Sequence, residues 1–156
     1  MTCTAMFYHL IRAGRDDTVA MIVTRAHAQG WNVMIRAPDQ AVLAQLDDRL
    51  WQGAEDGFLP HGVQGGAQDA DQPVLLGQGG ITNHARGLML LAGATTTRDE
   101  VVGLDRLWLI FDGGNEAEVQ AARAQWTEVT TWGLAAQYWS DETGSWVKKV
   151  DRPAPG

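Results

Sequence analysis

The stretch RLWLIFD, residues 106–112, is the clearest strand in the chain, and the residues DGGNEAEV that follow from Asp112 predict a turn into a helix. Large apolar side chains fill the first stretch, which is typical of a strand. In the second stretch Asn115 precedes Glu118 by three positions, which is the capping-box pattern of a helix start. The helix is predicted to run to Trp132, and its apolar face consists of Val119, Ala122, Trp126 and Val129. A strand that leads directly into a helix is the repeating unit of an α/β sheet.

The same order occurs twice in the first third of the chain. Residues 4–11 predict a strand, and the turn AGRDD after it ends in an aspartate that we expect to cap a helix closed by Gly30. The apolar face of this helix is Val19, Ile22, Val23 and Ala26. Residues 31–37 predict a second strand, nearly continuous in apolar character as in a buried parallel sheet. Asp39 is placed to cap a helix through Trp51, whose apolar face is Leu43, Leu46 and Leu50.

The rest of the chain completes a mixed sheet. Residues 53–72 are rich in Gly, Gln and Asp and predict a long loop, after which residues 73–77 and 87–93 predict short strands. Two segments around DETG, 134–140 and 145–150, predict a hairpin. We therefore expect an α/β fold: a three-layer Rossmann-like domain with a mostly parallel central sheet, helices on both faces and a C-terminal antiparallel hairpin.

Composition restricts where the protein works and what attracts it. The 156 residues, 45% of them hydrophobic, suit one domain, which we place at 1–150 with a flexible C-terminal tail at 151–156. Cys3 is the single cysteine, and no signal-like or bilayer-spanning run occurs, so we expect a cytoplasmic protein without an intramolecular disulfide. A formal net charge of −7 opposes non-specific attraction to nucleic-acid phosphates and anionic membranes.

The sequence contains no pattern that predicts catalytic residues, a metal site or a cofactor. Its four histidines lack the spacing of zinc ligands, and neither a dinucleotide fingerprint nor a phosphate loop occurs. One alternative is a small nucleotide- or cofactor-binding enzyme that uses the Gly113-Gly114 turn, although Glu116 and Glu118 in the helix's first turn would repel a bound anion. A weaker alternative is that some of the seven tryptophans bind single-stranded DNA directly.

A set of segments occurs in an order shared with a known protein family. They are FYHL (7–10), LDDRLW (46–51), FLPHG (58–62), LWLIFD (107–112), AARAQW (121–126), GLAAQYW (133–139) and SWVKK (145–149). In these segments the chain resembles the chi subunit of bacterial DNA polymerase III. The resemblance implies a non-catalytic adaptor in the clamp-loader complex of the replisome. It also implies two partners: the acidic C-terminal tail of the single-stranded-DNA-binding protein, and the psi subunit or a repair helicase on another surface.

The resemblance implies that Arg123 binds the acidic end of that tail. No carboxylate lies three or four positions from Arg123 on the predicted helix, so its guanidinium is available for a bidentate grip on a carboxylate. An apolar pocket beside it would receive the tail's terminal aromatic ring. The expected tail-binding residues are Arg123, Gln120, Trp126, Thr127 and Val119, with Lys148 and Lys149 adding positive charge nearby. From the residues alone, the alternative is that Arg123 only solvates a helix face.

The second surface implied by the resemblance is Phe58, Leu59 and Pro60, as the contact with psi or a helicase. The alternative is that these residues form a small core cluster under the sheet while His61 hydrogen-bonds to the backbone. The segment VQGGAQDADQ that follows FLPHG is longer than the family pattern, so the rim of this surface is expected to differ.

Overall fold

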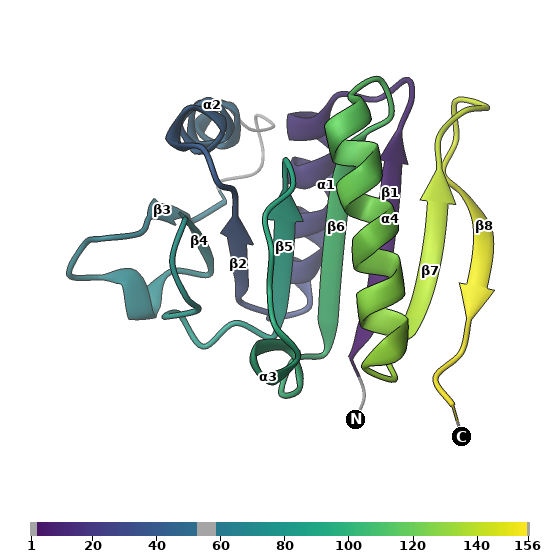
Figure 1. The fold of residues 1–156 in the computed structure, drawn as a ribbon. Coiled ribbons are helices and arrows are strands. Elements are labelled where there is room, and N and C mark those ends of the chain that lie inside the picture. Colours follow the sequence, from purple (N-terminus) through teal and green to yellow (C-terminus); the bar gives the residue numbers. More distant parts are fainter. Residues whose placement is uncertain (1–2, 53–58, 156) are drawn as a thin grey trace.

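The computed structural model describes residues 3–52 and 59–155, which form one eight-stranded sheet with helices on both faces (Figure 1). The strand order is β3-β4-β2-β5-β6-β1-β7-β8, and all neighbours are parallel except β7 and β8. The strands are β1 (Thr4–Leu10), β2 (Val33–Arg36), β3 (Gly62–Val63), β4 (Val74–Gly77), β5 (Gly87–Leu91), β6 (Arg106–Asp112), β7 (Ala135–Ser140) and β8 (Val147–Arg152). The helices are α1 (Arg15–Ala28), α2 (Gln40–Trp51), α3 (Arg98–Val101) and α4 (Glu116–Thr131), with a 3-10 turn at Asp69–Asp71. The predicted α/β fold with a C-terminal antiparallel hairpin is confirmed.

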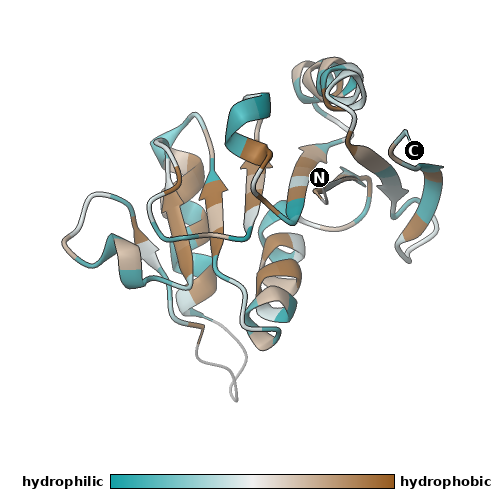
Figure 2. Ribbon diagram, turned by 90° about the horizontal axis from the view of Figure 1, so that it is seen from below, coloured by the Kyte–Doolittle hydropathy of each residue, from teal (hydrophilic) through white to brown (hydrophobic). Residues whose placement is uncertain are grey.

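The sheet separates two apolar cores. One core packs α1 and α2 against the sheet, and the other packs α3 and α4 against the opposite face; Figure 1 shows α4 in front of the strands and α1 behind them. Side chains of β1 alternate between the two, so that Phe7 belongs to the α4 core and Tyr8 to the α1 core. Figure 2 shows the resulting pattern, with hydrophobic residues along the central strands and two-sided colouring on the helices.

The helix starts follow local side-chain chemistry, with one correction. Asp39 accepts a hydrogen bond from the N–H of Ala41 at 2.8 Å, as predicted for the start of α2. The Asn115 side chain accepts from Glu118 N–H at 3.1 Å, which is one half of the predicted capping box. The expectation of an aspartate cap on α1 is wrong: the helix starts after Gly14, and both aspartates of AGRDD lie inside its first turn, where they suit the helix dipole.

The segment predicted as one loop before β4 contains ordered structure. Residues 53–58 lie outside the described part of the chain, but β3 and the 3-10 turn fall within the predicted loop. The Asp69 carboxylate accepts from the N–H groups of Gly65 and Gly66 at 2.9 and 3.0 Å. The Gln64 amide donates to Gly80 O at 2.8 Å and accepts from Gly79 N–H at 3.0 Å. Side-chain hydrogen bonds to backbone thus order a segment that has no apolar period.

The C-terminal hairpin continues beyond its predicted end. Strand β8 runs to Arg152, and Asp151 and Arg152 pair with Gln137 and Ala136, so two residues that we assigned to the tail belong to the sheet. A register shift occurs in β7 between Tyr138 and Trp139. None of the helices in the described ranges has the length and apolarity that a bilayer crossing requires.

Candidate functional site

A cavity of about 200 Å³ lies between α4 and the sheet, and we call it the α4 pocket. Its lining residues are Phe7, His9, Phe111, Val119, Ala122, Arg123, Trp126 and Tyr138. The helix contributes one apolar face and one arginine, whereas the strands contribute four aromatic or imidazole rings. The pocket is therefore aromatic inside and positively charged at one point of its wall.

Strand register explains why these rings meet. On β1, Phe7 and His9 are two positions apart and face α4, and their parallel partners are Tyr138 on β7 and Phe111 on β6. Phe7 packs edge-on against Trp126 of α4 with ring centroids 5.2 Å apart. His9 lies over Phe111 at 5.0 Å. Three neighbouring strands and one helix thus build a continuous ring-lined wall.

The polar groups of the pocket wall are paired with each other. His9 Nδ1 and the Tyr138 hydroxyl form a hydrogen bond across the β1–β7 pair. Burial raises the pKa of Tyr138, and the positive charge of Arg123 opposes part of that rise. The phenol therefore stays neutral at physiological pH, and Arg123 acts electrostatically on the same wall that His9 and Tyr138 form.

Arg123 is exposed, and within residues 3–52 and 59–155 its side chain has no ion pair or hydrogen bond. Of the other residues expected at this site, Val119 and Trp126 line the same pocket. Gln120 and Thr127 do not: the Gln120 amide donates to Glu116 at 2.8 Å, and the Thr127 hydroxyl lies 3.4 Å from the Arg123 carbonyl oxygen. The structure therefore brings together three of the five residues and leaves two on the outer surface of α4.

The two lysines expected to add charge are both in ion pairs. Lys148 contacts Asp151 at 2.8 Å, and Lys149 pairs with Glu142. The bond from Lys149 is the main reason why the pKa of Glu142 is lowered, and the charge of Glu142 in turn raises the pKa of Tyr138. Lys149 and Glu142 thus lie within electrostatic range of the α4 pocket, but the cation is neutralised by its neighbour.

Sequence reasoning missed the sheet side of the pocket. His9, for which we had predicted no role in the site, bonds to Tyr138 and lines the cavity. The available signal was the alternation of Phe7 and His9 on one predicted strand, together with aromatic residues at Phe111 and Tyr138 on two others. Their relative register, which no local pattern encodes, brings the four side chains together.

The Gly113-Gly114 turn is built without spare donors for a phosphate. Gly113 N–H donates to Leu10 O at 2.8 Å, and Gly114 N–H donates to Asp112 Oδ1 at 2.9 Å. A Cβ on Gly113 would lie 2.2 Å from His9 Nε2, so this glycine is required by close packing. The two N–H hydrogen bonds weigh against the nucleotide-binding alternative, because a phosphate-binding turn needs unpaired N–H groups.

The FLPHG segment is only partly described. Phe58 lies outside the described residues, whereas Leu59 is half-buried and packs against the α1 core. His61 is 6% exposed, its Nδ1 is 2.9 Å from Leu59 O, and its Nε2 is 3.0 Å from Asp47 Oδ1. The Trp51 ring contacts the His61 ring at 4.5 Å and is itself 59% exposed. In the described part of the segment, the buried His61 thus packs against the exposed ring of Trp51.

Among the described residues, no group of three or more His, Cys, Asp or Glu side chains is arranged to hold a metal ion. Cys3 is buried, and burial raises the pKa of its thiol to about 11. A thiol with such a pKa is protonated at neutral pH and is a poor nucleophile.

Comparison with known proteins gives two matches. The model of a family described as "DNA polymerase III chi subunit, HolC" matches residues 1–137. A curated relative, the DNA polymerase III subunit chi of Pseudomonas aeruginosa, is 31% identical over 78 residues. That alignment covers 50% of this chain and 54% of the relative, so the chain matches about half the length of that protein.

Proposed function

The chain belongs to the family of DNA polymerase III chi subunits, accessory subunits in DNA replication, and from this premise we propose that it is a non-catalytic adaptor at the bacterial replisome. In this proposal the α4 pocket binds the acidic C-terminal tail of the single-stranded-DNA-binding protein. The role would place the protein in the cytoplasm, beside the polymerase. The observation that carries the proposal is Arg123, whose guanidinium lies at the wall of an aromatic pocket and has no ion pair or hydrogen bond with a described residue.

The chemistry of the pocket suits such a peptide end. A guanidinium without an intramolecular partner can grip a carboxylate in a bidentate manner at no cost of breaking an existing ion pair. Beside Arg123, the rings of Phe7, Trp126 and Tyr138 offer an apolar cavity of about 200 Å³ for one aromatic side chain. The overall charge of −7 repels an acidic peptide at long range, so this single local charge has to supply the specificity.

Lys149 would take a secondary part in binding. Its partner Glu142 is on the surface, and a surface ion pair contributes about 0–1 kcal/mol, so an incoming carboxylate can replace it at small cost. We expect micromolar affinity, about −8 kcal/mol, that weakens with salt because much of it comes from charge-assisted hydrogen bonds.

Calorimetric titration with the tail peptide tests the site. Arg123→Ala should weaken binding by at least tenfold, which corresponds to about 1.4 kcal/mol. The matched control is Arg25→Ala, because Arg25 is also an exposed helical arginine without an ion pair in the described chain but lies on the opposite face of the sheet. Equal affinities of wild type and Arg123→Ala for the tail peptide would refute the assignment. Equal affinities of the wild-type protein for the full tail and for a tail without its terminal aromatic residue would also refute it.

We further propose that Phe58, Leu59 and Pro60 form the contact for the psi subunit or a repair helicase, which would link the bound tail to the clamp loader. Support comes from the exposed Trp51 ring against the buried His61, which places a large apolar group at the edge of this segment. Leu59 is half-buried, so its inner side packs against the α1 core and anchors the segment there.

A pull-down with tagged protein separates the two surfaces. Arg123→Ala should lose the single-stranded-DNA-binding protein and keep the second partner, and Phe58→Ala should do the reverse. Loss of both partners from either variant, in protein that unfolds normally with heat, would contradict two independent sites.

A further inference from the structure

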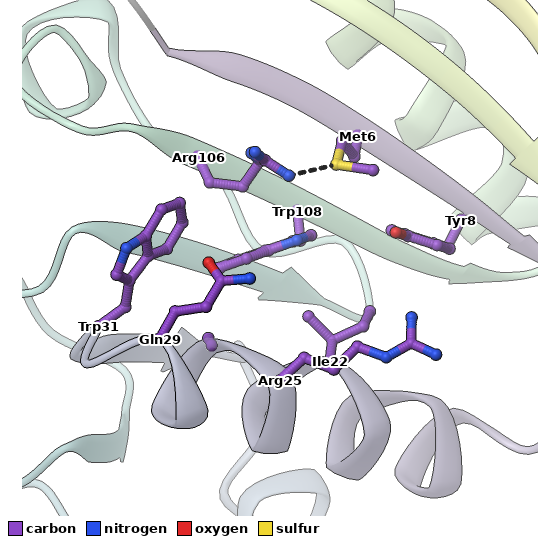
Figure 3. A pocket seen from close by; sticks show the side chains of 9 residues that line it. Met6, Tyr8, Ile22, Arg25, Gln29, Trp31, Arg106 and Trp108 are labelled. Carbon is purple, nitrogen blue, oxygen red and sulfur yellow. Dashed lines mark hydrogen bonds between the residues drawn. The ribbon is translucent and has the colours of Figure 1, made fainter.

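A second cavity of about 200 Å³ lies on the opposite face of the sheet, between α1 and the first residues of β1 and β6 (Figure 3). Met6, Tyr8, Arg106 and Trp108 reach it from the strands, whereas Ile22, Arg25, Gln29 and Trp31 reach it from α1 and the turn after it. We call it the α1 pocket. It shares no lining residue with the α4 pocket, so the proposed tail binding does not explain it.

Arg106 is the polar group of this pocket that most clearly lacks a partner. Its Nη1 donates to the Met6 sulfur at 2.9 Å, and its Nε is buried without a hydrogen-bond acceptor among the described residues. Thioether sulfur is a weak acceptor, and a buried charged donor without an acceptor is costly. Nη2 likewise makes no hydrogen bond with a described residue, and the edge formed by Nε and Nη2 has the geometry that binds the two oxygens of a carboxylate.

The surroundings reinforce the positive charge of Arg106. Its nearest sequence neighbour Asp105 is already paired with Arg86 at 2.7 Å, and the Arg86 guanidinium lies 4.9 Å from the Trp31 ring centroid. Arg25 has no ion pair in the part of the chain that the structure describes. Arg106 lies 5.7 Å from the Trp31 ring centroid, and neither it nor Arg25 has an ion pair with a described residue, so two arginines without a carboxylate partner face one cavity in a protein whose overall charge is −7.

The remaining groups of the wall include two polar side chains that can donate hydrogen bonds, Tyr8 and Gln29, and apolar surfaces. Burial raises the pKa of Tyr8, and the charges of Arg106 and Arg25 both oppose that rise, so its hydroxyl stays protonated and lies within range of both arginines. Figure 3 shows the Gln29 amide pointing towards the Trp108 ring, with Ile22 as the apolar side of the cavity. Donors at the ends and an apolar body between them match a small organic acid.

We propose that the α1 pocket binds a small organic carboxylate with a compact aromatic or branched apolar group. Its carboxylate pairs with the Nε–Nη2 edge of Arg106, and its apolar group lies against Trp108 and Ile22. Because Arg106 Nε is buried and the half-buried Trp31 ring lies 5.7 Å from the guanidinium carbon, binding includes a rotation of the Trp31 ring. A carboxylate is favoured over a phosphate dianion because the last turn of α1, with its partial negative charge, borders the cavity.

Titration with 3-phenylpropionate, followed by the indole N–H signals of ¹⁵N-labelled protein, tests this proposal. We expect saturable shifts of the Trp31 and Trp108 signals, assigned with Trp31→Phe and Trp108→Phe, and a Kd of about 0.1–1 mM as suits a ligand of this size. The uncharged amide of the same compound should not bind. Inorganic phosphate should not compete at equal concentration.

Variants identify which pocket is occupied. Arg106→Gln should weaken binding at least tenfold. Arg25 is exposed and its removal is not expected to affect folding, so Arg25→Ala should weaken binding by about twofold to fivefold. Arg123→Ala should bind with wild-type affinity because it lies in the α4 pocket. Unchanged affinity in both Arg106→Gln and Arg25→Ala would overturn the proposal. So would loss of binding in Arg123→Ala, equal binding of the amide, or displacement by phosphate.

Discussion

Asp141, at the end of β7, holds the connection between β1 and α1 through backbone hydrogen bonds. Its side chain is 3% exposed and accepts from the N–H groups of residues 11–13 at 2.6–3.2 Å. A hydrogen bond to a charged acceptor contributes about 1.5–3 kcal/mol. Because residues 11–13 are exposed, water can accept hydrogen bonds from their N–H groups in the variant and offset part of the loss. We therefore expect Asp141→Ala to lower the free energy of unfolding by about 2–4 kcal/mol, and Asp141→Asn, which keeps one acceptor oxygen, by about 1–2 kcal/mol.

Urea unfolding followed by tryptophan fluorescence measures these losses. With a slope of about 2 kcal/mol per molar urea, Asp141→Ala should shift the midpoint by about 1–2 M. The matched control is Asp48→Ala, since Asp48 is exposed on α2 and makes no ion pair with a described residue; its free energy of unfolding should stay within about 0.5 kcal/mol of wild type. A loss of less than about 1 kcal/mol in Asp141→Ala would refute the reasoning.

The pH dependence gives an independent check on the same carboxylate. Burial alone would raise the pKa of Asp141, but the N–H donors of residues 11–13 outweigh burial and hold it below its usual value of 3.8. A carboxylate with a depressed pKa in the folded state contributes its full stability above pH 3.8 and loses it as the pH falls through the folded value. The difference between wild type and Asp141→Ala should therefore be constant from pH 8 to 5 and narrow only in stronger acid.

Three further predictions concern other parts of the fold. Glu100 pairs with Arg36 through two hydrogen bonds, both 2.6 Å long. Glu100→Gln breaks this pairing and should lower the free energy of unfolding by about 1–2 kcal/mol at pH 7. Because the pairing lowers the pKa of Glu100, the difference in stability from wild type should narrow below pH 4.5 in urea titrations. Cys3, with a pKa of about 11 against an ordinary 9.0, should react with iodoacetamide at pH 8 about a hundredfold more slowly than in urea-unfolded protein. Gly87→Ala places a Cβ 2.3 Å from the Trp108 ring and should destabilise the protein by about 1–3 kcal/mol in thermal unfolding.

Gly103→Ala is the control for the last of these, because no atom lies within 4 Å of the Cβ it adds. Equal melting temperatures for the two alanine variants would contradict the packing argument. Alkylation of Cys3 at the same rate in folded and unfolded protein would mean that the thiol is reached without unfolding. A constant Glu100→Gln difference down to pH 3 would mean that the carboxylate charge does not carry the pairing.

Most of the fold could be predicted because its elements are long and strongly patterned. Strand β6 was predicted with its observed bounds, since seven residues of nearly unbroken apolar character cannot form an amphipathic helix. The buried faces of α1 and α2 followed from helical spacing in the same way. The region of β3 could not be predicted because Gln64 and Asp69 order it through hydrogen bonds to backbone that is distant or irregular.

The candidate site was also predictable only in part. The helix side of the pocket, with Arg123, was predicted from the family resemblance and from the spacing of residues along α4, which can be read directly from a sequence. The sheet side was missed because Phe7, Phe111 and Tyr138 come from three strands whose alignment depends on the whole sheet. Gln120 and Thr127, which we expected among the tail-binding residues, lie outside the pocket lining, because spacing on a helix does not show which polar side chains point inward.

The alternating strand β1 limits how the two pockets can be studied by mutation. Phe7 and His9 line one pocket while Met6 and Tyr8 line the other, so consecutive residues of a single strand form parts of both. Any substitution that shifts this central backbone changes both cavities together, and a defect seen in such a variant cannot be assigned to one of them. By contrast, α1 lines only one of these two pockets and α4 only the other, so these helices, rather than β1, are where separation-of-function variants should be sought first.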